Sequence, residues 1–239
     1  MLALDFDLLP DAMRAGAAQR LAEDVRRMGH LTTGFLGTPS LTRMLSENGH
    51  LDDAYTLLLN EKYPSWLYEV KQGATTIWER WDGKKPDSTF EEASMNSFNH
   101  YAYGAVGDWM YRVVAGLNSD PAQPGYWHII VRPQPGGGFT YATATLMTPH
   151  GEAASGWKID GDQLQITVRV PPNARATVNL PGAQLQDVRE GSSPLASTPG
   201  VTRSSQVGDT VVVEIGSGIY DFAYPAPALS ARVRRTATK

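Results

Sequence analysis

The chain has 239 residues and a formal net charge of −4, from 21 basic and 25 acidic side chains. Hydrophobic residues make up 41% and charged residues 19%, which is ordinary for a globular protein that buries a core. The absence of a basic excess argues against nucleic acid or an anionic membrane as a partner. Since the chain has no cysteine, disulfides, thiolate catalysis and cysteine-ligated metals are excluded.

The first half of the chain has a helical periodicity. Apolar residues recur three or four positions apart between Pro10 and Gly29, which predicts an amphipathic helix that ends at the glycine. Its expected buried stripe is Ala17, Leu21, Val25 and Met28. Two shorter helices are predicted over 39–47 and 52–61, and the short turns between them favour antiparallel hairpins. After an aperiodic stretch over 63–96, a further helix is predicted over 96–117.

In the second half the apolar period changes to two. Alternating apolar and polar residues predict strands over 163–170, 176–180 and 211–215, separated by turn residues rich in proline and glycine. This pattern is typical of an antiparallel β-sandwich. We therefore expect an α+β multidomain chain with a helical domain over 1–119 and a sandwich over 120–225. The basic end over 226–239 is expected to be a disordered tail.

Nothing in the sequence predicts attachment to a membrane. No apolar run approaches the roughly 20 residues that a helix needs to span a bilayer. The first residues, Met1-Leu-Ala-Leu-Asp-Phe-Asp7, lack the basic and apolar regions of a signal peptide. The compartment stays open on these grounds, with the cytoplasm favoured.

The densest group of chemically capable residues is Trp78-Glu79-Arg80-Trp81-Asp82. Indole faces are good platforms for the C–H surface of a sugar ring, and Arg80 would hold a neighbouring carboxylate in its ionised form. An ionised Glu79 would suit a general base. The alternative is an ordinary Glu-Arg surface pair flanked by core tryptophans, and the residues alone favour this second interpretation.

The remaining candidates are less specific. His100 lies 21 positions after Glu79 and could bind a sugar hydroxyl, although a lone histidine near a helix is more often a packing residue. The other histidines (His30, His50, His128 and His150) are too scattered to predict a metal site, and no paired-histidine motif is present. The glycines at 136–138 lack the context of a phosphate loop. We expect neither a metal nor a cofactor.

Four ordered segments carry a resemblance to a known family. They are Leu31-Thr-Thr-Gly-Phe-Leu-Gly-Thr-Pro39, Tyr63-Pro-Ser-Trp66, Gly73-Ala-Thr-Thr-Ile-Trp-Glu-Arg-Trp-Asp82 and Ser94-Met-Asn-Ser-Phe-Asn-His-Tyr-Ala-Tyr-Gly104. In order and spacing they resemble the bacterial α-L-rhamnosidases of glycoside hydrolase family 78. The resemblance covers roughly residues 1–135, and the sandwich matches the family's C-terminal domain more loosely.

The resemblance implies a partial (α/α)6 barrel followed by a β-sandwich, and the hydrolysis of terminal α-L-rhamnose from rhamnosides with inversion. It implies that Glu79 is the general base and that His100 contacts the sugar. Trp78 and Trp81 are implied as sugar-facing walls. The implied partner is a rhamnose-containing oligosaccharide or glycoside, with no nucleic acid and no membrane.

One departure from the family pattern limits the implied activity. The family's general acid belongs to an acidic motif upstream of the region that this chain matches, and the predicted helices are too few for six hairpins. We therefore expect an inactive fragment whose exposed helix faces allow association. Two alternatives remain: a non-catalytic carbohydrate-binding remnant, or a related hydrolase or lyase acting on another sugar. The upstream in-frame sequence would distinguish the binding remnant from an enzyme fragment. The preferred sugar would distinguish a related hydrolase or lyase from a rhamnosidase.

Overall fold

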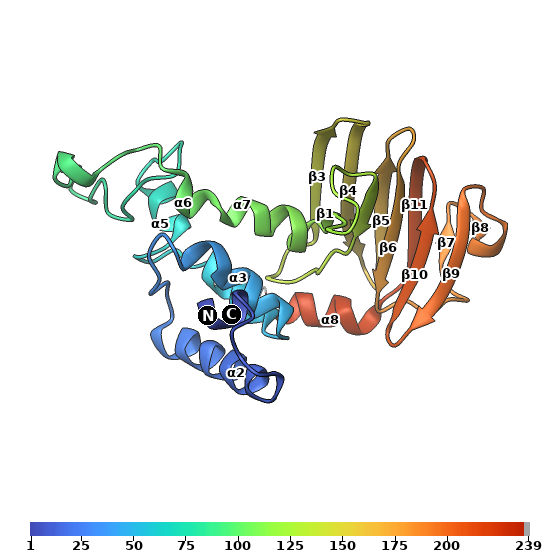
Figure 1. Cartoon of the computed structure of the whole chain (residues 1–239), viewed down its shortest axis with the longest axis horizontal. Coiled ribbons are helices and arrows are strands. Elements are labelled where there is room, and N and C mark those ends of the chain that lie inside the picture. Colours follow the sequence, from blue (N-terminus) through green and yellow to red (C-terminus); the bar gives the residue numbers. More distant parts are fainter. Residues whose placement is uncertain (237–239) are drawn as a thin grey trace. The chain divides into compact units, whose positions relative to one another are not determined.

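The computed structural model describes residues 1–236 of the chain. The chain folds as two compact units, Met1–Trp109 and Met110–Lys239. Helices and loops make up the first unit, and the labelled strands all lie in the second (Figure 1). The division comes earlier than the boundary predicted between residues 119 and 120. Residues before 120 already belong to the second unit, since the strand Leu117–Ser119 is paired into a sheet and side chains of the sandwich bind the carbonyls of Val114 and Ala115.

The helices of the first unit follow the predicted order. They are α1 (Leu2–Asp5), α2 (Asp11–Met28), α3 (Thr38–Glu47), α4 (Leu51–Leu58), α5 (Trp66–Lys71), the 3₁₀ turn η1 (Ala93–Met95), α6 (Tyr101–Gly104) and α7 (Val106–Trp109). The structure confirms the three helices predicted before residue 62, although α4 ends three residues earlier than expected, at Leu58 rather than 61.

Helix α2 ends where its sequence predicts. Gly29 has φ 72°, the left-handed conformation that glycine adopts without steric cost, and its N–H donates to the carbonyl of Val25. The buried face differs slightly from the predicted stripe. Ala18, Ala22 and Val25 are buried, whereas Met28 is 37% exposed. The small alanines let α2 approach α1 and α3 closely, with Met44 and Leu4 in the same cluster.

Helices α3 and α4 form a hairpin that anchors the start of the site region. They are joined by residues 48–50, and Leu45 and Ala54 are fully buried between them. The indole Nε1–H of Trp109, at the end of α7, donates to the Ser46 hydroxyl at 2.8 Å. The ring of Trp109 also packs edge-on against Tyr55, with centroids 5.2 Å apart. This hydrogen bond and ring contact hold α7 on the hairpin.

The helix predicted over 96–117 is wrong as a continuous element. Residues 96–100 are not helical, and the rest divides into α6, α7 and a π-helical turn, η2 (Met110–Val114). Apolar residues still recur at helical spacing, which explains the expectation. Glycines at 104 and 107 weaken a helix. The N–H groups of Ser97 and His100 bind elsewhere, to Glu79 and to the carbonyl of Ile77.

The second unit is a sandwich of two sheets, as Figure 1 shows. Its five-stranded sheet has the order β1-β2-β6-β10-β9 and its six-stranded sheet the order β3-β4-β5-β11-β7-β8. The strands are β1 (Leu117–Ser119), β2 (His128–Val131), β3 (Tyr141–Thr148), β4 (Gly151–Asp160), β5 (Gln163–Val170), β6 (Arg175–Pro181), β7 (Arg189–Glu190), β8 (Ser193–Pro194), β9 (Val201–Val207), β10 (Thr210–Ile215) and β11 (Gly218–Pro225), with the 3₁₀ turn η3 (Leu195–Ser197) after β8.

Within the described residues, the strand pairing is antiparallel except for one pair. β2 and β6 run parallel, because the chain returns through β3, β4 and β5 of the other sheet between them. The predicted strands at 163–170, 176–180 and 211–215 correspond to β5, β6 and β10. Their alternation is visible in the burial: along β5 the residues from Gln163 to Val170 are exposed and buried in turn.

Two side chains of the sandwich core bind the backbone at the end of η2. The Trp157 indole donates to the carbonyl of Val114 at 2.7 Å, and the Ser155 hydroxyl donates to the carbonyl of Ala115 at 2.6 Å. Both side chains are on β4 and are at most 2% exposed. Buried polar groups need partners, and here they bind the carbonyls that η2 leaves unpaired.

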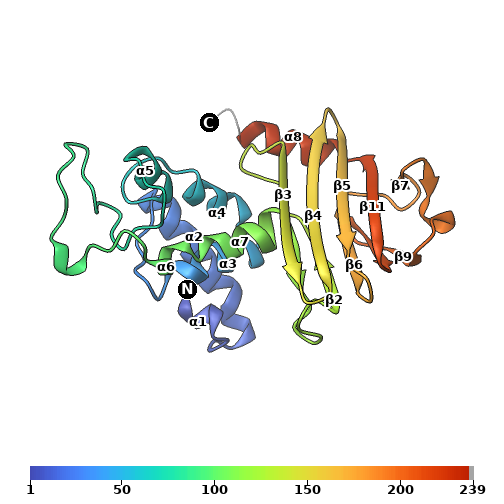
Figure 2. The same ribbon diagram turned by 90° about the horizontal axis from the view of Figure 1, so that it is seen from above.

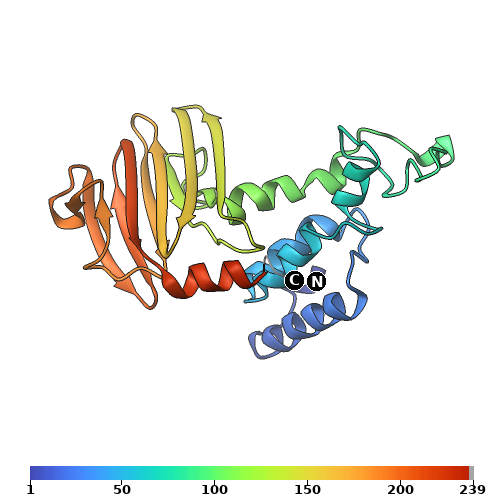
Figure 3. The ribbon, with the colours of Figure 1, turned by 180° about the vertical axis from the view of Figure 1, so that it is seen from behind.

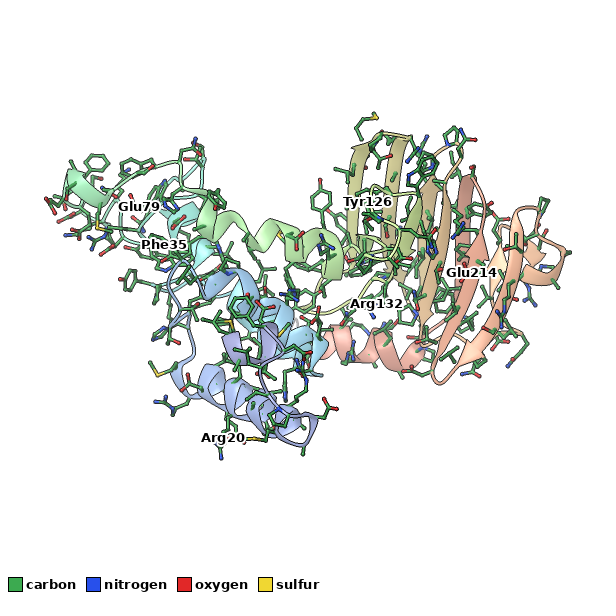
Figure 4. All side chains as sticks on the ribbon, in the orientation of Figure 1. Arg20, Phe35, Glu79, Tyr126, Arg132 and Glu214 are labelled. Carbon is green, nitrogen blue, oxygen red and sulfur yellow. The ribbon has the colours of Figure 1, made fainter. Side chains whose placement is uncertain are left out.

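A chain of polar side chains crosses the five-stranded sheet. The ring of His128 contacts Asp120 through Nδ1 and Thr177 through Nε2, both at 2.8 Å. The Thr177 hydroxyl also contacts the carboxylate of Glu214, labelled in Figure 4, at 2.9 and 3.0 Å. Hydrogen bonds from the Ala122 backbone N–H and then from the His128 ring hold the pKa of the Asp120 carboxyl below the usual value. The chain ties the β1–β2 connection to β6 and β10.

The expected disordered tail is wrong for most of its length. Residues Pro227–Thr236 form helix α8, which follows β11 and lies at one end of the strands (Figures 2 and 3). Val233 is 2% exposed, so the helix has a buried face. Arg234 donates to the carbonyl of Gly161 and to Asp162 in the β4–β5 turn, at 2.8 and 2.9 Å. Arg234 therefore helps to hold helix α8 on the β4–β5 turn. Residues 237–239 lie outside the described part.

Within residues 1–236, no helix has the length and apolar character needed to cross a membrane.

The sandwich core predicts a sharp contrast between two neighbouring positions of β5. Ile166 is fully buried, whereas Gln165 next to it faces solvent. We expect Ile166→Ala to lower the free energy of unfolding by about 2–5 kcal/mol, since it removes buried surface and leaves a cavity. Gln165→Ala should change it by less than about 0.5 kcal/mol. Native-state hydrogen exchange of the β5 and β11 amides measures both, and equal losses in the two variants would contradict the assignment of faces.

Candidate functional site

The candidate site is built around a cluster of aromatic side chains in the first unit. The rings of Trp81 and Tyr103 are stacked, with centroids 3.9 Å apart and planes 18° apart. Trp66, in α5, packs edge-on against Trp81 at 5.7 Å, and its Nε1–H donates to the Tyr103 carbonyl at 2.8 Å. All three residues are buried. The cluster therefore fixes α5, the Trp78–Trp81 segment and α6 relative to one another.

Glu79 is held by reciprocal hydrogen bonds with Ser97. The Glu79 N–H donates to the Ser97 carbonyl, and the Ser97 N–H donates to the Glu79 carboxylate Oε2, each at 2.8 Å. The His100 N–H donates to the Ile77 carbonyl at 2.9 Å, so two segments far apart in sequence run side by side. Figure 4 shows Glu79 in the loop region after α5. The residue is half-buried, and the hydrogen bond from the Ser97 N–H orients its carboxylate.

Arg80 does not act as the sequence suggested. Among the described residues, its ion pairs are with Asp82 at 3.4 Å and with Glu91 at 4.0 Å, rather than with Glu79. Glu91 also pairs with Lys85 at 2.7 Å, and this contact lowers the pKa of the Glu91 carboxyl. Arg80 therefore stabilises the loop that follows the site. The carboxylate of Glu79 is bound instead by the backbone N–H of Ser97.

That loop, residues 83–96, is closed at its base by one side chain. The Asn96 amide donates to the carbonyls of Gly83 and Glu91 at 2.9 and 3.3 Å. A Cβ at Gly83 would lie 2.6 Å from the Asn96 Oδ1, so any other residue there would displace the Asn96 amide. Phe90 packs edge-on against Phe98 at 5.7 Å. The aperiodic stretch of sequence is thus an ordered excursion beside Glu79.

His100 is oriented from three sides. Its Nδ1 accepts the N–H of Ala102 at 3.4 Å, which caps α6. Phe35 stacks on the imidazole with centroids 4.6 Å apart, and Tyr101, 88% exposed, is nearly parallel to it at 6.2 Å. Phe35, labelled in Figure 4, belongs to the Gly-Phe-Leu-Gly segment between α2 and α3. Since Nδ1 is an acceptor, the neutral ring carries its proton on Nε2 and presents it as a donor.

The four residues predicted for the site do not share one environment. Glu79 and His100 are half-buried and belong to the two paired segments. Trp78 and Trp81 are only 4% and 7% exposed. Trp78 packs edge-on against Phe98 at 5.3 Å, and Trp81 lies in the aromatic cluster. In this arrangement the indoles support the segment that carries Glu79, and exposed aromatic surface is offered by Tyr101.

Glu69, a buried acid of α5, was not among the residues predicted for the site. It is 1% exposed, and its carboxylate Oε2 accepts the N–H of Trp78 at 3.3 Å. No helix was predicted in this aperiodic stretch, so no local sequence signal indicated that the acid is buried. The described residues contain no group of three or more His, Asp or Glu side chains placed to hold a metal ion.

Comparison with known proteins assigns both units to one family. Residues 1–114 match the family model described as the bacterial alpha-L-rhamnosidase 6 hairpin glycosidase domain. Residues 116–193 match the bacterial alpha-L-rhamnosidase C-terminal domain. The predicted fold class, helical hairpins of a partial barrel followed by an antiparallel sandwich, is confirmed by these matches. The two sheets are open and do not close into a barrel.

Curated relatives carry the same description. An alpha-L-rhamnosidase of Formosa agariphila is 49% identical over 182 residues, which is 76% of this chain and 19% of the relative. One of Streptomyces avermitilis is 42% identical over 223 residues, which is 93% of this chain and 21% of the relative. The chain thus spans about a fifth of the length of these relatives.

Solved structures agree with the sequence matches. The crystal structure of Streptomyces avermitilis alpha-L-rhamnosidase complexed with L-rhamnose has a TM-score of 0.83 and 41% identity, covering 93% of this chain and 21% of that one. Native alpha-L-rhamnosidase from Aspergillus terreus has a TM-score of 0.78 and 36% identity, with 93% and 23% covered. The chain belongs to the bacterial α-L-rhamnosidase family, with a match to the six-hairpin domain over residues 1–114 and to the C-terminal domain over residues 116–193.

Proposed function

We propose that the chain is part of an inverting α-L-rhamnosidase that removes terminal α-L-rhamnose from glycosides, and that Glu79 is its general base. Family membership supports the glycosidase class. The observation that carries the role of Glu79 is its reciprocal pairing with Ser97, at 2.8 Å in each direction. A general base must hold its carboxylate within hydrogen-bond reach of the water it activates, and this pairing fixes the direction of the carboxylate.

We propose that His100 binds a hydroxyl of the rhamnosyl ring through Nε2–H. Its Nδ1 is occupied by the Ala102 N–H, so the tautomer that donates from Nε2 is favoured. Phe35 covers one face of the imidazole and limits its rotation. A hydrogen-bond donor on one segment and a carboxylate on the segment paired with it support binding of a polyhydroxylated ring.

We propose that Trp78 and Trp81 support the segment that carries Glu79. Their burial favours indirect action on the sugar, through the position of the Glu79 segment. Truncating Trp81 would also loosen its contacts with Trp66 and Tyr103, and truncating Trp78 would remove its contact with Phe98. Direct stacking on the sugar is better supported for Tyr101, whose ring is 88% exposed beside His100.

Inversion requires a second carboxylic acid. In inverting glycosidases the acid and the base are roughly 6.5–9.5 Å apart, which leaves room for the attacking water. The resemblance assigns only the base to a residue of this chain, and the chain spans about a fifth of its curated relatives. We therefore infer that the acid is contributed by polypeptide outside these 239 residues. Exposed apolar side chains of the first unit, such as Phe6 and Met13, support contact with that polypeptide.

The 239-residue chain should not turn over an aryl α-L-rhamnoside, because one carboxylate cannot act as both base and acid. Release of the aryl group, followed by absorbance, should equal that of buffer for the wild-type chain and for Glu79→Gln. Turnover by the wild-type chain that Glu79→Gln abolishes would refute the missing acid and show a complete catalytic site.

Binding separates the proposed substrate from other sugars. L-rhamnose should bind the chain more tightly than D-glucose or D-galactose, as measured by isothermal titration calorimetry. His100→Ala should weaken rhamnose binding by about tenfold, since it removes the proposed hydrogen bond from Nε2–H to the sugar. His150→Ala, in the β3–β4 turn of the second unit, is the matched control and should have no effect. Tighter binding of a different sugar would favour a related hydrolase or lyase instead.

A further inference from the structure

Glu69 is the most deeply buried acid of the first unit. It lies in α5, which Ser65 caps by accepting the Tyr68 N–H at 3.1 Å, and only 1% of its surface is exposed. An acid in such a place needs a structural or functional reason, because burying an ionised carboxylate without compensating partners is costly. The proposed mechanism gives Glu69 no role.

Glu69 holds both ends of the segment that leads to Glu79. Its backbone carbonyl accepts the N–H groups of Gln72 and Ala74, both at 3.0 Å. Its carboxyl Oε2 accepts the N–H of Trp78 at 3.3 Å, while Oε1 is buried and has no hydrogen-bond partner within residues 1–236. Glu69 thus binds backbone N–H groups at both ends of residues 72–78. The contact with the Trp78 N–H is one residue before Glu79.

The surroundings of the Glu69 carboxyl favour its neutral form. Burial raises its pKa to about 8, and the Trp78 N–H lowers it by less than burial raises it. The titratable group that senses it is Tyr103, whose pKa is raised by its own burial and then by the charge of Glu69. No charged side chain of the described residues contributes to the shift of Glu69. The acid therefore accepts the Trp78 N–H as a protonated carboxyl at neutral pH.

The backbone connects this contact to the proposed base. The Trp78 N–H is bound by Glu69, and the next N–H, that of Glu79, is bound by the Ser97 carbonyl at 2.8 Å. The Ser97 N–H returns to the Glu79 carboxylate. We propose that Glu69 is a positioning residue that fixes the direction of the Glu79 carboxylate by holding the backbone of Trp78. The inference rests on the proposed function only in naming Glu79 as the base.

The expected pH dependence has a definite sign. The pKa of Glu69 in the folded chain, about 8, lies above the ordinary value of 4.5. Its favourable contribution is therefore complete below about pH 4.5 and declines as the pH rises towards 8. Once Glu69 is ionised, its buried carboxylate has one N–H donor, and the segment should open to admit water. The backbone around Glu79 should therefore become less protected from hydrogen exchange above about pH 8.

The test is an NMR measurement on the 239-residue chain and two variants of Glu69. Glu69→Gln keeps a carbonyl oxygen that accepts the Trp78 N–H but cannot ionise. Glu69→Met has a similar length but no comparable acceptor. Glu92→Gln, the same replacement at an exposed acid of the same unit, is the control. The readouts are the amide chemical shifts of Trp78, Glu79 and Ser97 against pH, and their hydrogen-exchange protection at neutral pH.

In the wild type and in Glu92→Gln, the three amide shifts should inflect near pH 8. Glu69→Gln should remove the inflection and keep the protection. Glu69→Met should lower the protection of the Glu79 and Ser97 amides by about tenfold, while that of helix α3 stays unchanged. Unchanged protection at Glu79 and Ser97 in Glu69→Met would overturn the proposal.

An inflection that persists in Glu69→Gln would overturn it as well, and this result is available even if Glu69→Met fails to fold. A parallel titration of the wild type with L-rhamnose keeps the two proposals separate. Failure to bind rhamnose would count against the proposed function alone, because the amide readouts do not depend on a ligand.

Discussion

The pairing of residues 77–79 with residues 97–100 is the interaction on which the candidate site depends. These segments come from the two ends of a long excursion, and three backbone N–H groups join them: Glu79 to Ser97, Ser97 to the Glu79 carboxylate, and His100 to Ile77. The pairing places the proposed base, Glu79, and the proposed sugar-binding residue, His100, on two hydrogen-bonded segments. It also explains why the segment before α6 is extended, since a helix there would withdraw the same N–H groups.

The aromatic cluster gives this pairing a rigid support. Trp81 stacks on Tyr103, Trp66 binds the Tyr103 carbonyl, and Trp78 packs against Phe98. Buried rings of this size contribute large apolar areas and define a unique packing. The tryptophans that flank Glu79 in sequence therefore stabilise the site from behind, and the exposed aromatic surface comes from residues further along the chain. Glu69 adds a polar contact to the same support, at the backbone of Trp78.

Local signals in the sequence predicted much of the fold. Gly29 ends α2 because a residue there adopts a positive φ, and the alternation along β5 reports its two faces directly. Other features depend on contacts between distant residues. The predicted helix over 96–117 failed because its apolar spacing persists through Trp109, while the N–H groups of Ser97 and His100 bind the 77–79 segment. Helix α8 was missed because its basic residues suggested a tail, whereas Arg234 docks it on the β4–β5 turn.

The same distinction applies to the site. The motif that contains Glu79 identified the segment, but its residues favoured an Arg80 partner that the structure gives to Asp82 and Glu91. Sequence spacing cannot show that a backbone N–H eighteen positions away directs the carboxylate. Nor can it show that Glu69 is buried, since an acid on a short helix is ordinarily solvated.

A residue-resolved NMR titration of the 239-residue chain with L-rhamnose tests the central claim most directly. The largest shift changes should occur at Glu79, Ser97, His100 and Tyr101, and Glu79→Gln should reduce them. Changes confined to the sandwich strands, or changes around His100 that do not respond to Glu79→Gln, would contradict it.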